Sequence, residues 1–374
     1  MIRTTNVFRL GIKELWSLLR DPLMLALIVY TFTFSIYIAA TAMPDTLHNA
    51  PIAVLDEDGS PLSARVIASF YPPHFKLPAM ISPAEEDPGL DHGLYTFVLD
   101  IPPGFQRDVL AGRTPAMQLN VDATLMSQAF AGSGYIQQIV SGEVDDFLQR
   151  YRRTATPAVD LVQRIRFNPN LDQAWFGSLM ELINNVTMLS IILTGAALIR
   201  EREHGTIEHL LVMPVTPAEI MLAKVLSMGL VVLLAALMAL VCVVHGALKV
   251  PLQGSIVLFL VAAALHLYAT TSMGIFLATL ARSMPQFGML LVLVLLPLQL
   301  LSGGSTPRES MPKFLQDLML TMPTTHFVSA GQAILERGAG LGVVWPQFLA
   351  LAAIGSVLFA ASLKRFRRTI SQMT

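Results

Sequence analysis

Long uncharged stretches constrain this 374-residue chain more than any other feature. A helix needs about 20 apolar residues to cross the hydrocarbon core of a bilayer. Hydrophobic residues make up 53% of the chain and charged residues only 14%, which excludes an ordinary water-soluble enzyme. Stretches of the required character lie at 23–43, 175–199, 225–247, 255–281, 287–301 and 345–363. We therefore predict an α-helical integral membrane protein with six transmembrane helices.

Residues 44–174 separate the first two stretches, and we predict that they form an α/β domain. Strands are expected at 51–55, 95–100 and 117–122, and helices at 61–70, after 102–104 and at 127–153. Nine basic residues against sixteen acidic ones give the part 44–172 a net charge of −7. The short loops on the opposite side carry lysine and arginine. The positive-inside rule thus places both termini in the cytoplasm and this domain outside it.

The first 43 residues combine an amphipathic interfacial helix with the first transmembrane helix. Phe8, Ile12, Leu15, Trp16 and Leu19 share one helical face, as in a helix that lies on a membrane surface. The small residues at 40–42 also resemble the cleavage site of a signal peptide. Because a signal peptide needs no amphipathic leader, we predict that residues 1–43 are retained.

The loop between the second and third stretches is rich in charge and in residues that interrupt helices. Gly205 and Pro214 flank a short amphipathic segment at about 206–213. Directly after it, Thr216-Pro217-Ala218-Glu219 matches a capping box with proline at the first helical position. We expect a short surface helix at 206–213, followed by the capped start of a new helix. Together they would project from the membrane and could receive force from a cytoplasmic partner.

This loop resembles the signature of ABC-2 type permeases, the membrane subunits of bacterial ABC exporters. The similar residues are Glu201, Gly205, Thr206, Glu208, Leu211, Pro214, Pro217, Glu219 and Lys224. Residues 302–336 resemble the family's outer re-entrant hairpin through Ser302-Gly303, Pro307, Met311-Pro312 and Pro323-Thr324. The resemblance covers the whole chain and extends to inner-membrane permeases that work with a tandem-domain ATPase of the ribosome-associated type and a membrane-fusion adaptor.

The resemblance implies a non-enzymatic permease subunit in a bacterial inner membrane. It implies no catalytic residue and no cofactor in this chain, with ATP and Mg²⁺ bound by a separate ABC ATPase. Further implied partners are a second permease half, identical or related, and a periplasmic adaptor that contacts the domain 44–174. The residues implied to couple to the ATPase are Glu201, Arg202, Glu203, Gly205, Thr206, Glu208 and Pro214. Separately from the resemblance, the nearly uncharged composition of the spans favours a hydrophobic or amphipathic substrate.

One motif and one alternative function bear on this interpretation. Residues 301–305, Leu-Ser-Gly-Gly-Ser, nearly match the signature of ABC ATPases, but no Gly-Lys pair exists to form a phosphate-binding loop. The energy must therefore come from another chain. The alternative function is a membrane scaffold that moves nothing and whose outer domain recruits a partner.

Polar residues at helical spacing mark the second stretch. Ser178, Glu181, Asn184, Asn185 and Met188 fall on one helical face. Polar groups inside a bilayer face protein or water, so this face either lines a conduit or bonds neighbouring helices.

Two other classes of function are not supported by the sequence. His204 and His209 are five residues apart with a glycine between them, which does not match the spacing of a metal-binding helix, so no metal site is expected. The net charge of −1 provides no overall positive field to attract a nucleic acid.

Overall fold

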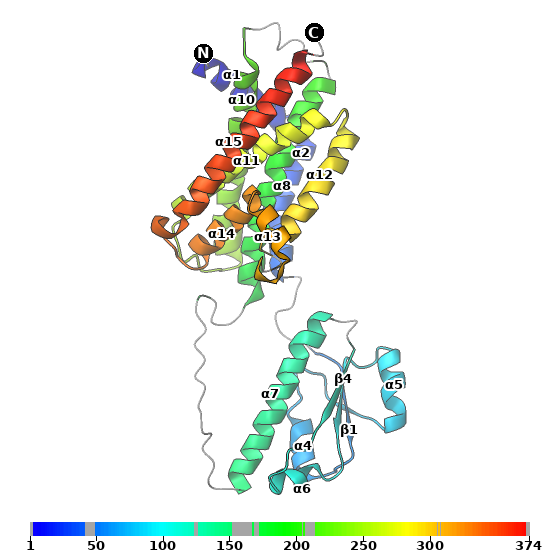
Figure 1. The fold of residues 1–374 in the computed structure, drawn as a ribbon. Helices are drawn as coiled ribbons and strands as arrows, with labels where there is room; N and C mark the ends of the chain where they lie inside the picture. The colour runs from blue at the N-terminus through cyan, green and yellow to red at the C-terminus, as the bar shows by residue number, and fades with distance from the viewer. Residues whose placement is uncertain are drawn as a thin grey trace. The chain divides into compact units, whose positions relative to one another are not determined.

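The chain forms two compact units. The computed structural model describes residues 3–41, 49–122, 126–151, 167, 172–203, 205, 214–304, 306 and 308–371. Met1–Met43 and Arg166–Thr374 make the first unit, called the membrane unit below, and Pro44–Ile165 make the second. Figure 1 shows the membrane unit as a bundle of long helices and the second unit as a small sheet with helices.

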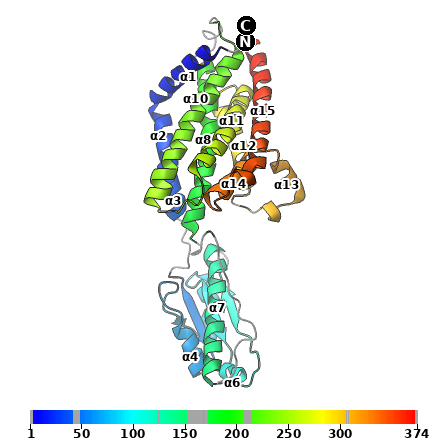
Figure 2. The ribbon, with the colours of Figure 1, turned by 90° about the vertical axis from the view of Figure 1, so that its left-hand side faces the viewer.

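The membrane unit consists almost wholly of helices (Figures 1 and 2). Its N-terminal part holds α1 (Thr4–Leu19), α2 (Pro22–Tyr30), the π-helix η1 (Thr31–Ser35) and α3 (Ile36–Thr41). The rest holds α8 (Gln173–Glu203), α10 (Pro217–Met238), the π-helix η2 (Ala239–Ala247), α11 (Ile256–Leu280), α12 (Met284–Leu300), η3 (Arg308–Ser310), α13 (Lys313–Met319), α14 (Pro323–Leu335) and α15 (Leu341–Ser371). The most buried long helix is α8, which packs against η1, α3, α10, α11, α12 and α14.

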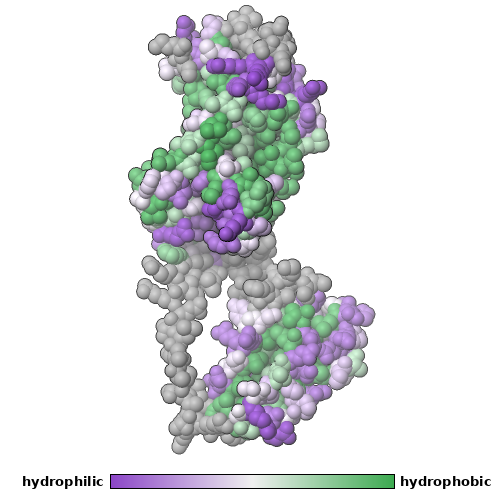
Figure 3. Space-filling model, in the orientation of Figure 1, coloured by the Kyte–Doolittle hydropathy of each residue, from purple (hydrophilic) through white to green (hydrophobic). Residues whose placement is uncertain are grey.

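Five helices in the described part of the chain are long and apolar enough to cross a bilayer. They are Pro22–Thr41, Ala174–Glu203, Pro217–Ala247, Ile256–Leu280 and Leu341–Thr369. The stretch expected as the fifth span forms α12, which is apolar but only 17 residues long. Figure 3 shows hydrophobic surface across the middle of the membrane unit and hydrophilic groups toward its ends. The fold is that of a mostly helical membrane protein, and the count of six spans stays a prediction.

The core of the bundle forms where α8 and α11 cross closely. A Cβ atom at Gly274 would lie 2.6 Å from the Ile191 carbonyl oxygen, and one at Gly195 would lie 3.1 Å from the Gly274 carbonyl oxygen. Small residues let membrane helices approach in this way. Nearby, the Thr187 hydroxyl lies 2.8 Å from Nε2 of the buried His266. Close contact and hydrogen bonding thus fix α8 against α11.

The second unit is a four-stranded sheet with helices. Its strands are β1 (Ile52–Asp56), β2 (Ala79–Met80), β3 (Phe97–Ile101) and β4 (Gln118–Val121), and its helices are α4 (Pro61–Ala68), α5 (Pro83–Asp91), α6 (Phe105–Leu110) and α7 (Met126–Tyr151). The order is β2-β1-β3-β4, with β4 antiparallel to β3 and the other pairs parallel. The strands expected near 51–55, 95–100 and 117–122 are present, whereas β2 and α5 were not expected. The extracytoplasmic position of this unit stays a prediction.

Candidate functional site

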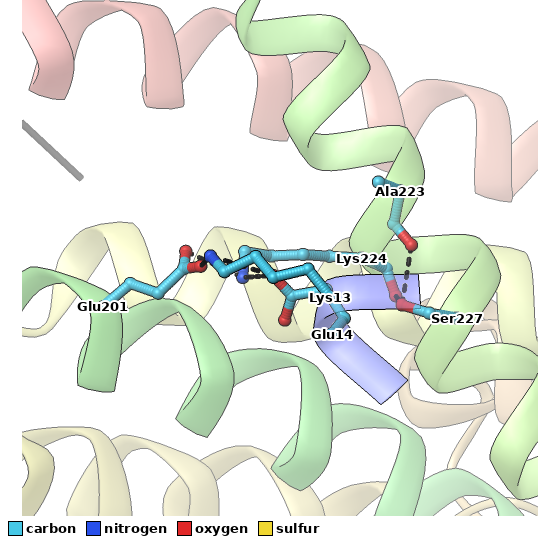
Figure 4. A network of polar contacts seen from close by, with 6 residues as sticks. All are labelled: Lys13, Glu14, Glu201, Ala223, Lys224 and Ser227. Carbon is cyan, nitrogen blue, oxygen red and sulfur yellow. Dashed lines mark hydrogen bonds and ion pairs between the residues drawn. The ribbon is translucent and has the colours of Figure 1, made fainter. Parts of the chain in front are cut away.

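Four charged residues from three helices meet at one end of the membrane unit (Figure 4). In this charged cluster, Lys224 Nζ lies 2.8 Å from Glu14 Oε1 and 2.8 Å from Glu201 Oε2. Lys13 Nζ donates to Glu201 Oε1 at 2.5 Å. The Lys224 side chain is only 1% exposed, while that of Lys13 is 45% exposed. The cluster therefore ties α1 to the end of α8 and the start of α10.

The two lysines and two glutamates of the charged cluster balance each other in formal charge. Burial raises the pKa of the Glu14 carboxyl, and the ammonium of Lys224 opposes this shift. Removing charges from water is costly, and attraction compensates only when the geometry is good. Beside the cluster lies a cavity of about 210 Å³ whose lining includes Glu14, Glu201 and the apolar Leu193. These contacts hold three helix segments in one defined arrangement.

The C-terminal end of α8 is further anchored by its two arginines and Glu203. Arg200 forms an ion pair with Asp21, whose side chain also caps α2 by accepting from Met24 N at 3.1 Å. Arg202 Nη2 donates to the Ala281 carbonyl oxygen at 2.5 Å, just after α11. Glu203 Oε1 accepts from the backbone nitrogen of Met284 at 2.9 Å, at the start of α12. The last turn of α8 thus contacts α2, α11 and α12.

The start of α10 is anchored to the N-terminus of α1. Thr216 and Glu219 form the expected capping box, with Glu219 Oε2 accepting from Thr216 N at 2.7 Å. The other carboxylate oxygen, Oε1, accepts from the backbone nitrogen of Arg3 at 2.6 Å. Asn6 Nδ2 donates to the Pro214 carbonyl oxygen at 3.4 Å. Both ends of the segment 204–213 are therefore joined to α1.

The structure brings together only part of the set expected to couple to an ATPase. Glu201, Arg202 and Glu203 contact their own chain, as described above. Gly205 has φ +68, a left-handed conformation that favours glycine, and Pro214 is exposed. Thr206 and Glu208 lie outside the described residues, as does the expected surface helix at 206–213. Contact of the expected coupling set with an ATPase stays a prediction.

The polar face of α8 divides into a packed part and a half-buried part. Asn185 is buried and donates to the Thr31 carbonyl oxygen at 2.9 Å, at the start of η1. Ser178 is also buried and donates to its own helix at the Trp175 carbonyl oxygen. The half-buried residues of this face are Glu181, Asn184 and Met188.

Glu181 contacts the first span from this half-buried part. Its Oε1 accepts from the Ser35 hydroxyl at 2.5 Å, at the end of η1. Glu181 and Asn185 therefore contact the two ends of the same π-helix. The buried Asn185 side chain therefore serves helix packing, whereas part of the Glu181 side chain is still exposed.

Sequence reasoning missed Glu14 as a site residue, although a signal existed. Glu14 lies four residues after Leu10 and four before Leu18, so a single acid interrupts the face of α1 that packs on the bundle. Lys224 likewise immediately precedes an apolar stretch. An isolated charge on an otherwise apolar face predicts a buried partner of opposite charge. The identity of that partner required the structure.

No metal site appears in the described residues, where no three histidine, cysteine or carboxylate side chains gather. His204 and His209 lie outside the described part of the chain. The charged cluster instead pairs carboxylates with ammonium groups, which suits helix-to-helix contact.

Apolar helices long enough to span a bilayer, a charged end with anchored loop ends and a polar face on the central helix are features of a multi-span helical membrane protein. The chain belongs to the ABC-2 family of transporter proteins, whose family model matches residues 22–364. It is 64% identical over 368 residues to the inner membrane transport permease YhhJ of Escherichia coli strain K12, covering 98% of each chain. It is 29% identical over 362 residues to the probable multidrug ABC transporter permease YbhR of that strain, covering 96% of this chain and 97% of that one.

Membership of this family settles the class of the protein. The chain is a permease subunit of the ABC transporter family. Its apolar helices and its similarity to an inner membrane permease indicate a multi-pass inner-membrane protein. The family also implies an ATPase as a partner of this subunit.

Proposed function

We propose that this chain is the membrane-spanning subunit of an ATP-driven exporter, and that a separate ABC ATPase docks on segment 204–213. The anchored ends of that segment support the proposal most directly. Glu201 and Glu219 join the two ends to α1, and Arg200 joins α8 to the cap of the first span. Movement of the segment would therefore reach α1 and the first span together. Thr206 and Glu208 would contact the ATPase, and the charges at the end of α8 would transmit the movement.

The proposed topology has six spans, with α12 as the short fifth one and both termini in the cytoplasm. Figure 1 shows the N- and C-termini at the same end of the membrane unit as α1. That end also carries basic residues, including Arg20 between α1 and α2, Arg282 between α11 and α12, and Arg365 in the last turns of α15. Positive charge favours the cytoplasmic side. On this orientation the domain 44–174 lies in the periplasm, and 302–336 forms the outer hairpin.

The proposed assembly contains two permease halves, a tandem-domain ATPase and a periplasmic adaptor on the domain 44–174. The half-buried residues Glu181, Asn184 and Met188 would face the path between the two halves. The relative YbhR is described as a probable multidrug permease, which agrees with a hydrophobic or amphipathic substrate for this chain.

Transport by the permease reconstituted with its ATPase in proteoliposomes tests the proposal. We expect ATP-dependent movement of a hydrophobic dye, and loss of that movement in Glu208→Lys with both proteins still folded. Glu201→Lys is a poorer probe, because Glu201 contacts Lys13 and Lys224 and a third ammonium group would disrupt the cluster. Unchanged transport and unchanged ATPase stimulation in Glu208→Lys would contradict coupling through this segment.

The scaffold alternative makes a different prediction in the same assay. A scaffold would retain its partners but move no substrate at any ATP concentration. Membership of the transporter family does not favour the scaffold alternative. Binding of partners without ATP-dependent movement of a substrate would support it.

A further inference from the structure

Glu181 is the single aspartate, glutamate, lysine or arginine in all six apolar stretches of the sequence. It lies seven residues after Ala174, the first residue of the α8 span, or roughly 10 Å along the helix axis at 1.5 Å per residue. A carboxylate at membrane depth is expensive unless a cation, a hydrogen-bond donor or water compensates its charge. Its surroundings therefore indicate what the site is built to receive.

The compensation at Glu181 differs from that of the acidic residues at the charged end of the membrane unit. Glu14 and Glu201 are paired with Lys224, and Asp21 is paired with Arg200. Glu181 forms no ion pair within the part of the chain that the structure describes. Its hydrogen bond comes from the neutral hydroxyl of Ser35. The carboxyl group of Glu181 thus has a hydrogen-bond donor but no cationic partner among the described residues.

The neighbours of Glu181 on the half-buried part of the α8 face indicate which kind of ligand would fit beside its carboxyl group. Asn184 and Met188 follow at three and seven residues, so the three side chains lie on one face, and all are half-buried. The amide of Asn184 can accept or donate a hydrogen bond, and the thioether of Met188 is apolar and adapts to irregular shapes. A carboxylate beside an adaptable apolar surface matches a ligand that carries positive charge on an apolar body.

We propose that Glu181 is the cation-recognising residue of the transport path and that the permease takes lipophilic organic cations. This inference rests on the proposed function, because the path between two permease halves must exist for the face to meet a substrate. Glu181 supplies the counter-charge, Met188 contacts the apolar body, and Ser35 holds the carboxylate in position. In an assembly of two identical halves, two such carboxylates would face the path.

Binding and transport of matched probes test the inference on the complete permease–ATPase complex in nanodiscs and proteoliposomes. The probes are tetraphenylphosphonium, a lipophilic cation, and triphenylphosphine oxide, a neutral molecule of related shape. We expect Glu181→Gln to weaken binding of the cation by about tenfold or more, because the counter-charge is lost. Binding of the neutral probe should change by less than about twofold, since it offers no charge to the carboxylate. Glu181→Asp should retain preference for the cation.

Two further variants separate charge recognition from helix packing. Ser35→Ala removes the hydrogen bond and keeps the carboxylate, so the cation should still bind; a packing role predicts instead that Ser35→Ala resembles Glu181→Gln. Asp317→Asn removes one negative charge from the exposed surface of α13 and should leave both probes unaffected.

The outcomes also distinguish this inference from the proposed function. Equal losses for both probes in Glu181→Gln, or no loss for either, would overturn the cation site while leaving ATP-driven export intact. A wild-type complex that moves the neutral probe and ignores the cation would do the same. A wild-type complex that moves neither probe but still moves the hydrophobic dye would overturn the cation site alone, whereas one that moves neither the probes nor the dye, even with ATP, would overturn both.

Discussion

At the scale of single residues, Lys224 holds together groups that could not otherwise be buried. Its ammonium contacts Glu14 and Glu201, whose side chains are 6% and 12% exposed. We predict that Lys224→Met lowers the free energy of unfolding by about 3–5 kcal/mol, because removing one partner of a buried pair leaves uncompensated charge. The midpoint of thermal unfolding in detergent measures the loss.

Two comparison variants test the cause of that loss. Lys13→Met removes an ammonium that is 45% exposed and should cost less than about 1 kcal/mol. The double change Lys224→Met with Glu14→Leu should recover part of the stability, because Glu201 then keeps Lys13 as its partner. Equal losses of unfolding free energy for Lys13→Met and Lys224→Met would show that burial does not determine how much each lysine of the cluster contributes to stability.

At the scale of elements, helix α6 in the second unit depends on a cap from outside its own sequence. Its N-cap residue, Gly104, has no side chain, and Asp58 from the loop after β1 accepts from Gln106 N at 3.1 Å. Partial burial would raise the pKa of Asp58, but hydrogen bonds from Ser60 and the start of α6 outweigh it and lower that pKa below the usual value. The ionised carboxylate therefore stabilises the helix end.

We predict that Asp58→Asn exposes the α6 amides to faster hydrogen exchange at neutral pH, at a cost of about 0.3–1 kcal/mol, because the amide keeps an acceptor oxygen but loses the negative charge that favours a helix N-terminus. Because the folded pKa is lowered, the wild-type advantage is present above the unfolded pKa and disappears as the pH falls through the folded pKa. Exchange measured at neutral pH and at a series of decreasing pH values below the usual aspartate pKa of about 3.9, corrected for intrinsic rates, should show the difference shrinking as the pH falls. A difference that stays constant across the whole series would contradict capping by the carboxylate.

The elements also show where the sequence stops predicting the fold. Hydrophobic periodicity and length predict α8, α10, α11 and α15, because a helix that crosses the bilayer needs a long apolar stretch within its own sequence. The first span was expected to be one helix, but it contains the π-helix η1, whose ends bond Asn185 and Glu181 from α8. The Glu14–Lys224 contact joins residues 210 positions apart. Spacing along one helix carries no information about such partners.

At the scale of the whole molecule, each unit has a hydrophobic core of its own. The core of the second unit contains residues such as Phe75 and Phe97, and the cores of the membrane unit are formed by that unit's residues. We predict that replacing residues 44–172 by a flexible glycine-serine linker leaves the membrane unit folded, because no buried cluster of the described residues is opened. The variant should still bind the ATPase, whose proposed docking segment is 204–213.

The same replacement should abolish capture of the periplasmic adaptor, which we propose binds the domain 44–174. Co-purification of ATPase and adaptor with tagged permease measures both interactions in one experiment. A matched control, Arg65→Gln, breaks the ion pair with Glu143 between α4 and α7 but keeps the domain, so it should retain both partners. Loss of the ATPase together with the adaptor would mean that the second unit is needed to fold the membrane unit. Retention of the adaptor would place its binding surface on the membrane unit and overturn the assigned role of the domain.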